Sequence, residues 1–415
     1  MAEDVDPIAT HTSPAEGSNL TTVMKRRLRA VLVDRATPRF TELLASALDA
    51  SKPGPAIVPL DASLPPARLD ALLHAFDPDE VEDAGGVTTV SSDRNGVSED
   101  TAVIVSTSGS TGEPKGVRLS ASALLHSARA SLTRLGAAPG QRWLCCLPVT
   151  HIAGIQVLVR SLAGGTEPYL AASVDAQTVT DAGCAHISLV PTQLARLDPA
   201  ALAGYKSVLL GGAAAAAGQV DRARAAGIPV VTSYGMSETC GGCVYDGIPL
   251  DGVSAEVRDD DGGRIWIAGP VLFAGYCGAG PSGQWFRTGD LGAMAADGTL
   301  IVRGRADDVI NTGGHKVVPA EVVTALQEYP GVRDAAVFGQ TDPEWGERVV
   351  AVVVPTDPHD PPTLKMLRIH VKERLPRYAA PSKVVLVDAV PMLPSGKPDL
   401  MRLRQGLSDL GAGTN

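Results

Sequence analysis

Ser106-Thr-Ser-Gly-Ser-Thr-Gly-Glu-Pro-Lys-Gly116 is the most informative segment of the chain. It follows an apolar run, Val103–Val105, that is typical of a buried strand, and it precedes a helical pattern opened by Ser120. Glycines allow the backbone to turn tightly and approach an anion, so amides and hydroxyls can surround phosphate oxygens. Lys115 would neutralise charge. The segment is not a Walker A loop, because Gly116 follows the lysine. It predicts a phosphate-binding loop, with a flexible polar loop as the alternative.

On both sides of this segment, short β-rich runs alternate with Ala/Leu-rich helical patterns from Met24 to about Arg303. This alternation predicts an α/β fold with layered, mainly parallel sheets. The expected strands are Ala102–Ser106, Trp143–Leu147, Ile187–Val190, Ser207–Leu210 and Pro229–Val231. The expected helices are Ser120–Leu135, Gly154–Ala163, Pro191–Leu197 and Ala217–Ala226. After Pro249 the shorter strands Arg264–Ala268 and Thr299–Arg303 predict a small β subdomain.

A separate unit begins near Asp307, where the order of elements changes. The order helix, strand, strand, helix, strand predicts a compact α+β domain of ordinary size. These elements are expected at Pro319–Glu328, Val332–Gly339, Glu347–Val354, Leu364–Leu375 and Lys383–Val387. The fold class is therefore multi-domain α/β, with a large N-terminal and a small C-terminal domain.

Composition excludes several classes of protein. A net charge of −10 argues against a general nucleic-acid binder, which needs a basic surface. No apolar stretch approaches the length of a membrane helix, and no secretory signal is visible, so we expect no membrane insertion and a cytoplasmic location. Residues 1–23 have the composition of a disordered tail. The sequence leaves open whether Met1 or Met24 is the start.

The cysteines are interpreted as structural. Cys145 and Cys146 lie in an apolar run typical of buried strand thiols. Cys240-Gly-Gly-Cys243 has metal-ligand or redox spacing, but a zinc site needs about four ligands and no second such pair exists. The role of Cys240 and Cys243 stays open.

Further motifs follow the phosphate loop in a recognisable order. They are Tyr234-Gly-Met-Ser-Glu-Thr239, Arg287-Thr-Gly-Asp-Leu291, Gly304-Arg-Ala-Asp-Asp308 and Pro394-Ser-Gly-Lys397. With these motifs the chain resembles the adenylate-forming superfamily, which includes acyl-CoA synthetases, luciferases and peptide-synthetase adenylation domains. The resemblance covers most of residues 100–400 and implies ATP, Mg²⁺ and coenzyme A as cofactors and cosubstrates.

The resemblance also implies roles for individual residues. Tyr234 would lie against the adenine, together with Gly235 and Met236, and Thr239 near the phosphates. Glu238 would supply the hard oxygen ligand that Mg²⁺ prefers. Asp290 suits the two ribose hydroxyls, as acidic residues often do in nucleotide sites. The phosphate loop would contribute Thr107, Ser108, Gly109, Ser110, Thr111 and Gly112, with Lys115 as a catalytic cation.

A hinge and a mobile domain are implied as well. Arg305 would contact ribose or phosphate, and Asp307 matches the position about which the family's two domains swivel. Lys397 would enter the site for adenylation, because a cation must bring two anions together. Rotation would then replace it by the loop containing Gly313 and Gly314 for attack by the thiol. The expected units are the tail 1–23, the adenylation domain 24–304, the hinge 305–308, the mobile domain 309–407 and a tail 408–415.

The substrate pocket is expected around small and polar residues. The family builds it from segments that here contain His151, Ser188, Thr192, Gly211, Gly212 and Ala213. These segments and the short region before the loop resemble o-succinylbenzoate–CoA ligases of menaquinone biosynthesis, although Val149-Thr150 replaces the usual Leu-His. The alternatives are a ligase for another aryl or acyl acid, transfer to a carrier-protein thiol, or a non-catalytic paralogue that binds nucleotide or acyl groups. Family members are often dimers, so a homodimer is a further expectation.

Overall fold

The computed structural model describes residues 25–90, 96–108, 114–216, 218–280, 283–392 and 398–411. Several predictions fall outside these described residues. They concern the tail at 1–23, Met24, the end of the C-terminal tail (412–415), Gly109, Ser110, Thr111, Gly112 and Lys397. Ser108 and residues 406–411 are described by their backbone alone.

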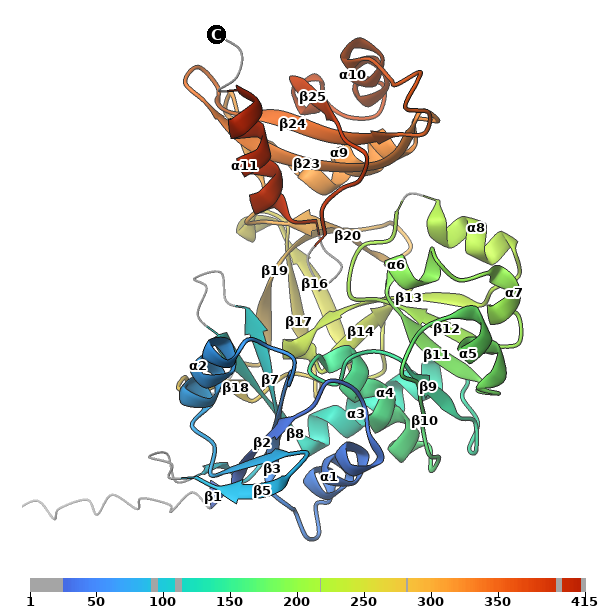
Figure 1. Cartoon of the computed structure of the whole chain (residues 1–415). Helices are drawn as coiled ribbons and strands as arrows, with labels where there is room; N and C mark the ends of the chain where they lie inside the picture. The colour runs from blue at the N-terminus through green and yellow to red at the C-terminus, as the bar shows by residue number, and fades with distance from the viewer. Residues whose placement is uncertain are drawn as a thin grey trace, which may run out of the picture.

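The first sheet has the strand order β18-β8-β7-β3-β2-β4-β5 (Figure 1). Its centre is parallel, since β2 pairs with β3 and β4, and β3 pairs with β7. Strands β5, β8 and β18 add antiparallel edges. The bounds are β2 Leu28–Leu32, α1 Pro38–Leu48, β3 Ala56–Leu60, α2 Pro66–Phe76, β4 Glu80–Asp83, β5 Gly86–Thr89, β7 Thr101–Ser108, β8 Pro114–Ser120 and β18 Gly275–Tyr276, with β1 Lys25–Arg26 paired to β6 Val97–Ser98 beside this sheet.

The second sheet has the order β10-β9-β11-β12-β13-β14-β15. It is parallel from β10 to β13, which confirms the α/β prediction, and antiparallel from β13 to β15. The strands are β9 Trp143–Cys145, β10 Tyr169–Leu170, β11 His186–Leu189, β12 Ser207–Leu210, β13 Val230–Met236, β14 Gly241–Tyr245 and β15 Ile248–Pro249. The helices are α3 Ala121–Arg134, α4 Ile152–Ala163, α5 Ala176–Asp181, α6 Pro191–Leu194, α7 Pro199–Leu202 and α8 Gln219–Ala225.

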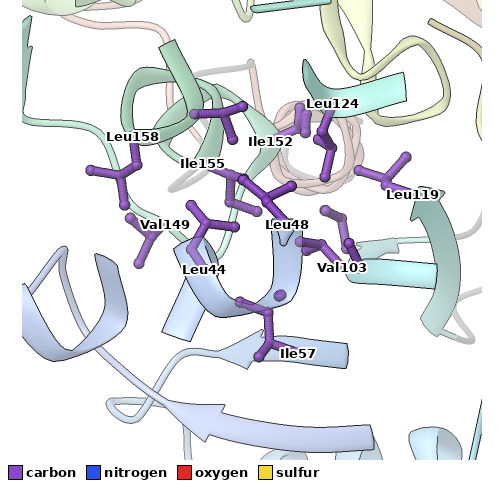
Figure 2. Packing of buried hydrophobic residues seen from close by; sticks show 14 of the residues in the cluster. Leu44, Leu48, Ile57, Val103, Leu119, Leu124, Val149, Ile152, Ile155 and Leu158 are labelled. Carbon is purple, nitrogen blue, oxygen red and sulfur yellow. The ribbon is translucent and has the colours of Figure 1, made fainter. Parts of the chain in front are cut away.

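A continuous apolar core joins the two sheets through α1, α3 and α4 (Figure 2). Ile57 and Val103 come from the first sheet, Leu44 from α1, Leu124 from α3 and Ile155 from α4, and all are 0% exposed. Each such side chain contributes about 1.5–3 kcal/mol when it is buried. The core therefore holds α4 firmly against its neighbours, and α4 carries one side of the candidate site.

The phosphate segment differs from its prediction in one respect. The helix expected from Ser120 is confirmed, since Ser120 caps α3 by accepting from the amide of Ala123. Strand β8, which was not predicted, lies between the phosphate segment and this helix. Val117 and Leu119 are buried on β8 and alternate with the half-buried Arg118, which is a strand period rather than a helical one. Strands β7 and β8, on either side of residues 109–113, therefore pair as a hairpin, and α3 begins only after β8.

The remaining strands form a small sheet and a C-terminal unit. The small antiparallel sheet, predicted as a β subdomain, has the order β16-β17-β19-β20, with β16 Ser254–Arg258, β17 Arg264–Ala268, β19 Trp285–Met294 and β20 Leu300–Arg305. The C-terminal sheet has the order β22-β21-β24-β23, with β25 parallel to β24. Its elements are β21 Ile310–Thr312, β22 His315–Val317, α9 Pro319–Gln327, β23 Val332–Asp342, β24 Gly346–Pro355, α10 Leu364–Lys372, β25 Lys383–Leu386 and α11 Leu400–Gly411.

The C-terminal unit lies on the side of the molecule where β20 ends (Figure 1). An ion pair joins the two parts, with Arg303 Nε 2.5 Å from Glu321 Oε1 on α9. Gly304 has φ +151°, and a Cβ there would lie 2.8 Å from Val318, so the close approach of the two parts requires glycine at this position. Within the described part of the chain, no helix is long and apolar enough to span a bilayer.

Candidate active site

The candidate site lies where parallel strands of the second sheet end. Ser188 is close to the end of β11, Gly211 directly follows β12, and Tyr234 lies in the second half of β13. The carboxyl ends of neighbouring parallel strands meet at one edge, which is where α/β folds bind ligands. His151 precedes α4, at its N-cap position, and makes no capping hydrogen bond. Ser188, Gly211 and Tyr234 therefore lie at the same edge of this sheet.

Tyr234, Asp290 and Arg305 form a hydrogen-bonded group at the edge of this site. The Tyr234 hydroxyl donates to Asp290 Oδ2 at 2.9 Å, and Arg305 Nη1 donates to Oδ1 at 3.2 Å. Strands β19 and β20 place Asp290 directly opposite Arg305. Burial and then the charge of Asp290 raise the pKa of Tyr234, so the phenol stays a donor. A carboxylate has about four acceptor positions, so Asp290 retains capacity for two further hydroxyl donors.

Glu238, Tyr276 and Lys115 form a second group beside the phosphate hairpin. Tyr276 donates from its hydroxyl to Glu238 Oε1 at 2.8 Å, and Lys115 Nζ lies 5.8 Å from the centre of the Tyr276 ring. Burial and then the charge of Glu238 raise the pKa of Tyr276. Tyr276 was not predicted from the sequence, since it lies alone on the short strand β18 with no motif around it.

The chemistry of Glu238 fits a magnesium ion. Mg²⁺ in nucleotide sites usually takes one or two carboxylates together with phosphate oxygens and waters. Glu238 is only partly buried and keeps acceptor capacity beyond the bond from Tyr276. Lys115 is exposed nearby, and Thr107 donates from its hydroxyl to the Lys115 carbonyl at 3.3 Å across the hairpin. The arrangement can accommodate a metal-bound polyphosphate.

Thr239 is fully buried and its hydroxyl is already engaged. It accepts from the amide of Met236 at 2.9 Å and donates to the carbonyl of Gly241 at 2.7 Å. Gly235 lies so close to β14 that a Cβ would be 2.0 Å from the carbonyl oxygen of Gly241. These contacts indicate that Gly235 and Thr239 shape the turn that carries Glu238.

Arg160 is a candidate binding residue that the sequence did not reveal. It is 4% exposed on α4 and donates from Nη2 to Ser188 Oγ at 2.9 Å, while its Nε has no partner among the described residues. Burial lowers the pKa of the guanidinium. The available signal was one charged residue within the otherwise uncharged run Ile152–Ala163. A buried arginine without a carboxylate partner is costly, and an anionic ligand would offset that cost.

The other predicted pocket residues follow β11 and β12 in the chain and contribute small side chains and backbone. Gly212 has φ +82° and a Cβ there would lie 3.3 Å from Val190. Gly211 and Ala213 are half-buried beside it, and Thr192 is half-buried on α6. The side chain of the neighbouring Gln193 accepts from the amide of Val190 at 3.0 Å and so caps α6.

The predicted hinge adjoins the Tyr234 group through Arg305, whereas the predicted glycine loop lies in another part of the fold. Asp307 is exposed, 3.8 Å from Arg305 Nη2. Gly313 and Gly314, with φ +56° and +80°, form the two-residue turn of the β21–β22 hairpin, a conformation for which glycine is preferred. They belong to the C-terminal sheet and not to the group around Tyr234.

The cysteines show the properties of structural thiols. Cys240 and Cys243 are free and fully buried, and burial raises the pKa of both. Burial likewise raises the pKa of Cys145 and Cys146 to about 12. Within the described ranges, no group of three or more His, Cys, Asp or Glu side chains is placed to hold a metal ion. These thiols are therefore poor nucleophiles at neutral pH.

Comparisons with known proteins agree with this geometry. A family model described as AMP-binding enzyme matches residues 74–277, and one described as AMP-binding enzyme C-terminal domain matches residues 321–397. A probable 2-succinylbenzoate–CoA ligase of Mycobacterium tuberculosis is 47% identical over 324 residues, covering 73% of this chain and 84% of that protein. The 2-succinylbenzoate–CoA ligase of Listeria monocytogenes is 32% identical, covering 73% and 70%.

Solved structures show the same architecture. The o-succinylbenzoate CoA synthetase of Bacillus subtilis, in complex with its acyl-adenylate intermediate, matches with a TM-score of 0.77 and 28% identity over 92% of this chain and 89% of that one. The same enzyme with ATP and magnesium matches with a TM-score of 0.76 and 27% identity over 92% and 90%. This chain therefore belongs to the family of AMP-binding, adenylate-forming enzymes, in which it is similar to the 2-succinylbenzoate–CoA ligases.

Proposed function

We propose that this enzyme is an AMP-forming acid–thiol ligase that converts 2-succinylbenzoate to its coenzyme A thioester, a step of menaquinone biosynthesis. The observation that carries the choice of acid is Arg160, a buried guanidinium whose one hydrogen bond within the described structure is to Ser188. 2-Succinylbenzoate has two carboxylates, and only one of them is activated. The other needs a partner, and a desolvated arginine can bind a carboxylate through parallel hydrogen bonds.

The nucleotide is assigned to the groups around Asp290 and Glu238. Asp290 would accept from the ribose hydroxyls through the positions left free by Tyr234 and Arg305, and Tyr234 would present its ring to the adenine. Mg²⁺ held by Glu238 and the phosphates would neutralise charge on the polyphosphate. Lys115 and the amides of the hairpin loop would bind the remaining phosphate oxygens.

The reaction proceeds in two halves. The substrate carboxylate attacks the α-phosphorus of ATP, the acyl–phosphate bond forms, and pyrophosphate leaves. The thiol of coenzyme A then attacks the acyl carbon, and AMP leaves. In our proposal Lys397 stabilises the first transition state, and rotation of residues 309–407 about the hinge 305–308 brings Gly313 and Gly314 to the adenylate for the second.

Substrate identity can be tested by pyrophosphate release with a panel of acids. We expect 2-succinylbenzoate to be used well, and 3-benzoylpropionate and 2-butyrylbenzoate, which each lack one of its carboxylates, to be used poorly. Arg160→Met should lower kcat/KM for 2-succinylbenzoate by roughly a hundredfold, because removing one partner of a buried charge pair typically costs about 2–5 kcal/mol. Efficient use of a different acid by the wild type, with no signal from 2-succinylbenzoate, would identify another aryl- or acyl-CoA ligase.

The proposal includes a cytoplasmic location, where ATP and coenzyme A are supplied. It also includes assembly as a homodimer, which sedimentation of the purified protein tests directly. A single sedimenting species with the mass of one chain would exclude the dimer and leave the proposed reaction unaffected.

A further inference from the structure

Trp143 is a fully buried residue of β9 that contacts the Arg160 side chain. The guanidinium carbon of Arg160 lies 4.4 Å from the centre of the indole, within the range of a cation–π interaction. His186 of β11 also stacks on Trp143, with ring centres 4.9 Å apart and 26° between the planes. Trp143 and His186 are both 0% exposed. The three side chains therefore connect α4 to two strands of the sheet beneath the acyl site.

His186 is fixed on both ring nitrogens. Nε2 lies 3.0 Å from Gln141 Oε1, which also accepts from the amide of Ala138, so this oxygen can only accept and Nε2 must donate. Nδ1 then accepts from the Ser207 hydroxyl at 2.8 Å. Burial and then the charge of Arg160 lower the pKa of His186 to about 4, so the ring is neutral at pH 7 and adds no second positive charge next to Arg160.

Arg160 needs such a support because little else within the described residues holds it. Its one hydrogen bond is to Ser188, and both its Nε and the indole Nε1 lack partners. Arginine has a long, rotamer-rich side chain, and an unsupported guanidinium loses much of its freedom when it binds an anion. A flat aromatic surface fixes the plane of the guanidinium before the ligand arrives, which reduces that cost.

We propose that Trp143 and His186 are positioning residues, which act through Arg160 to give the enzyme its preference for a dicarboxylate. This inference rests on the proposed function, in which Arg160 binds the second carboxylate. Neither residue takes part in the transfer of the acyl group. Their effect should therefore fall on recognition of the acid and leave the chemistry of adenylation unchanged.

The test compares Trp143→Leu, which removes the aromatic surface, with Trp143→Phe, which keeps a smaller one. We expect Trp143→Leu to raise KM for 2-succinylbenzoate about tenfold to thirtyfold with kcat changed less than about threefold, and Trp143→Phe to restore most of the loss. The analogues 3-benzoylpropionate and 2-butyrylbenzoate each carry one carboxylate and can be tested as inhibitors. For the analogue that lacks the carboxylate bound by Arg160, the inhibition constant should differ less than about twofold between Trp143→Leu and the wild type. His186→Asn, which keeps a hydrogen-bonding side chain for Ser207, provides a second variant if Trp143→Leu does not fold.

Equal losses for 2-succinylbenzoate and for both analogues would overturn the inference, because they would indicate general damage to packing. The Arg160→Met background separates this inference from the proposed function. If Trp143→Leu raises the KM for 2-succinylbenzoate by a further tenfold or more in that background, Trp143 does not act through Arg160 and the inference is wrong, while the proposed function stands. If Arg160→Met alone leaves the preference for 2-succinylbenzoate intact, Arg160 does not bind the second carboxylate and the inference fails. The proposed function fails only if the wild type gives no pyrophosphate with 2-succinylbenzoate.

Discussion

Tyr234→Phe removes one hydroxyl from the proposed nucleotide site and leaves the ring in place. That hydroxyl donates to Asp290 Oδ2 at 2.9 Å, and Asp290 is 8% exposed, so water cannot readily replace the donor. A hydrogen bond to a charged group contributes about 1.5–3 kcal/mol. Without it, the carboxylate is held by Arg305 alone and can turn away from the ribose. Taking about 2 kcal/mol as the cost of restoring its orientation, we expect AMP to bind roughly thirtyfold more weakly.

Tyr276→Phe is the matched control, because it also removes a half-buried phenol hydroxyl from a carboxylate. Its hydroxyl donates to Glu238, which we assign to the metal and not to the nucleoside. Calorimetric titration should therefore show that Tyr276→Phe weakens binding of MgATP but leaves AMP affinity within about threefold of the wild type, a difference below 0.7 kcal/mol. Unchanged AMP affinity in Tyr234→Phe, or an equal loss of AMP affinity in both variants, would refute this assignment of the two carboxylates.

Three further outcomes are expected. Lys397→Ala should slow adenylation by about a hundred- to a thousandfold yet preserve thioester formation from supplied acyl-AMP; equal loss of both half-reactions in rapid-quench assays would contradict the two-conformation mechanism. His186, whose pKa burial and the nearby Arg160 lower to about 4, stays neutral in the folded state while the unfolded chain takes up a proton below about pH 6.5. The free energy of unfolding should therefore decrease as the pH is lowered, by about 2 kcal/mol between pH 7 and pH 5 in urea unfolding. In His186→Asn this decrease should be absent; if the free energy of unfolding of the variant changes with pH as in the wild type, His186 does not titrate in that window. Gly235→Ala should destabilise the chain by about 3 kcal/mol through its clash with Gly241, whereas Gly204→Ala, where a Cβ meets nothing within 4 Å, should change the melting temperature little; similar melting temperatures would contradict the close strand contact.

Much of the fold could be predicted because local signals agreed with tertiary structure. The parallel strands of the second sheet are short apolar runs between helical patterns. Both of their faces are covered, so their sequences contain no regularly spaced polar residues that could be mistaken for a helical pattern. In the C-terminal unit, the expected order of elements is that of α9, β23, β24, α10 and β25. Strand β8 was missed because Pro114 and Gly116 mask its start, and its partner across the hairpin is what makes it a strand.

The site was only partly predictable, for a physical reason. Tyr234, Glu238, Asp290 and Arg305 lie in motifs, so their types and spacing are visible in the chain. Tyr276 and Arg160 act through neighbours that are distant in sequence, since Tyr276 donates to Glu238 and Arg160 to Ser188. A residue whose environment is assembled from several strands carries no local signature, and only the fold shows that it is buried or unpaired.

The two sides of the site compensate charge in different ways, and this difference has a consequence for selectivity. On the proposed nucleotide side Asp290 is paired with Arg305 and Tyr234, and Glu238 with Tyr276, so the carboxylates are held in place before ligand binds. Such preorganised groups bind any nucleotide of the right shape with little rearrangement. On the proposed acyl side the buried Arg160 has no carboxylate partner among the described residues. A neutral or monocarboxylic acid would leave its charge without a partner. The penalty for the wrong acid is therefore built into the unliganded protein, whereas the nucleotide side carries no comparable penalty, and discrimination among acids should exceed discrimination among nucleotides.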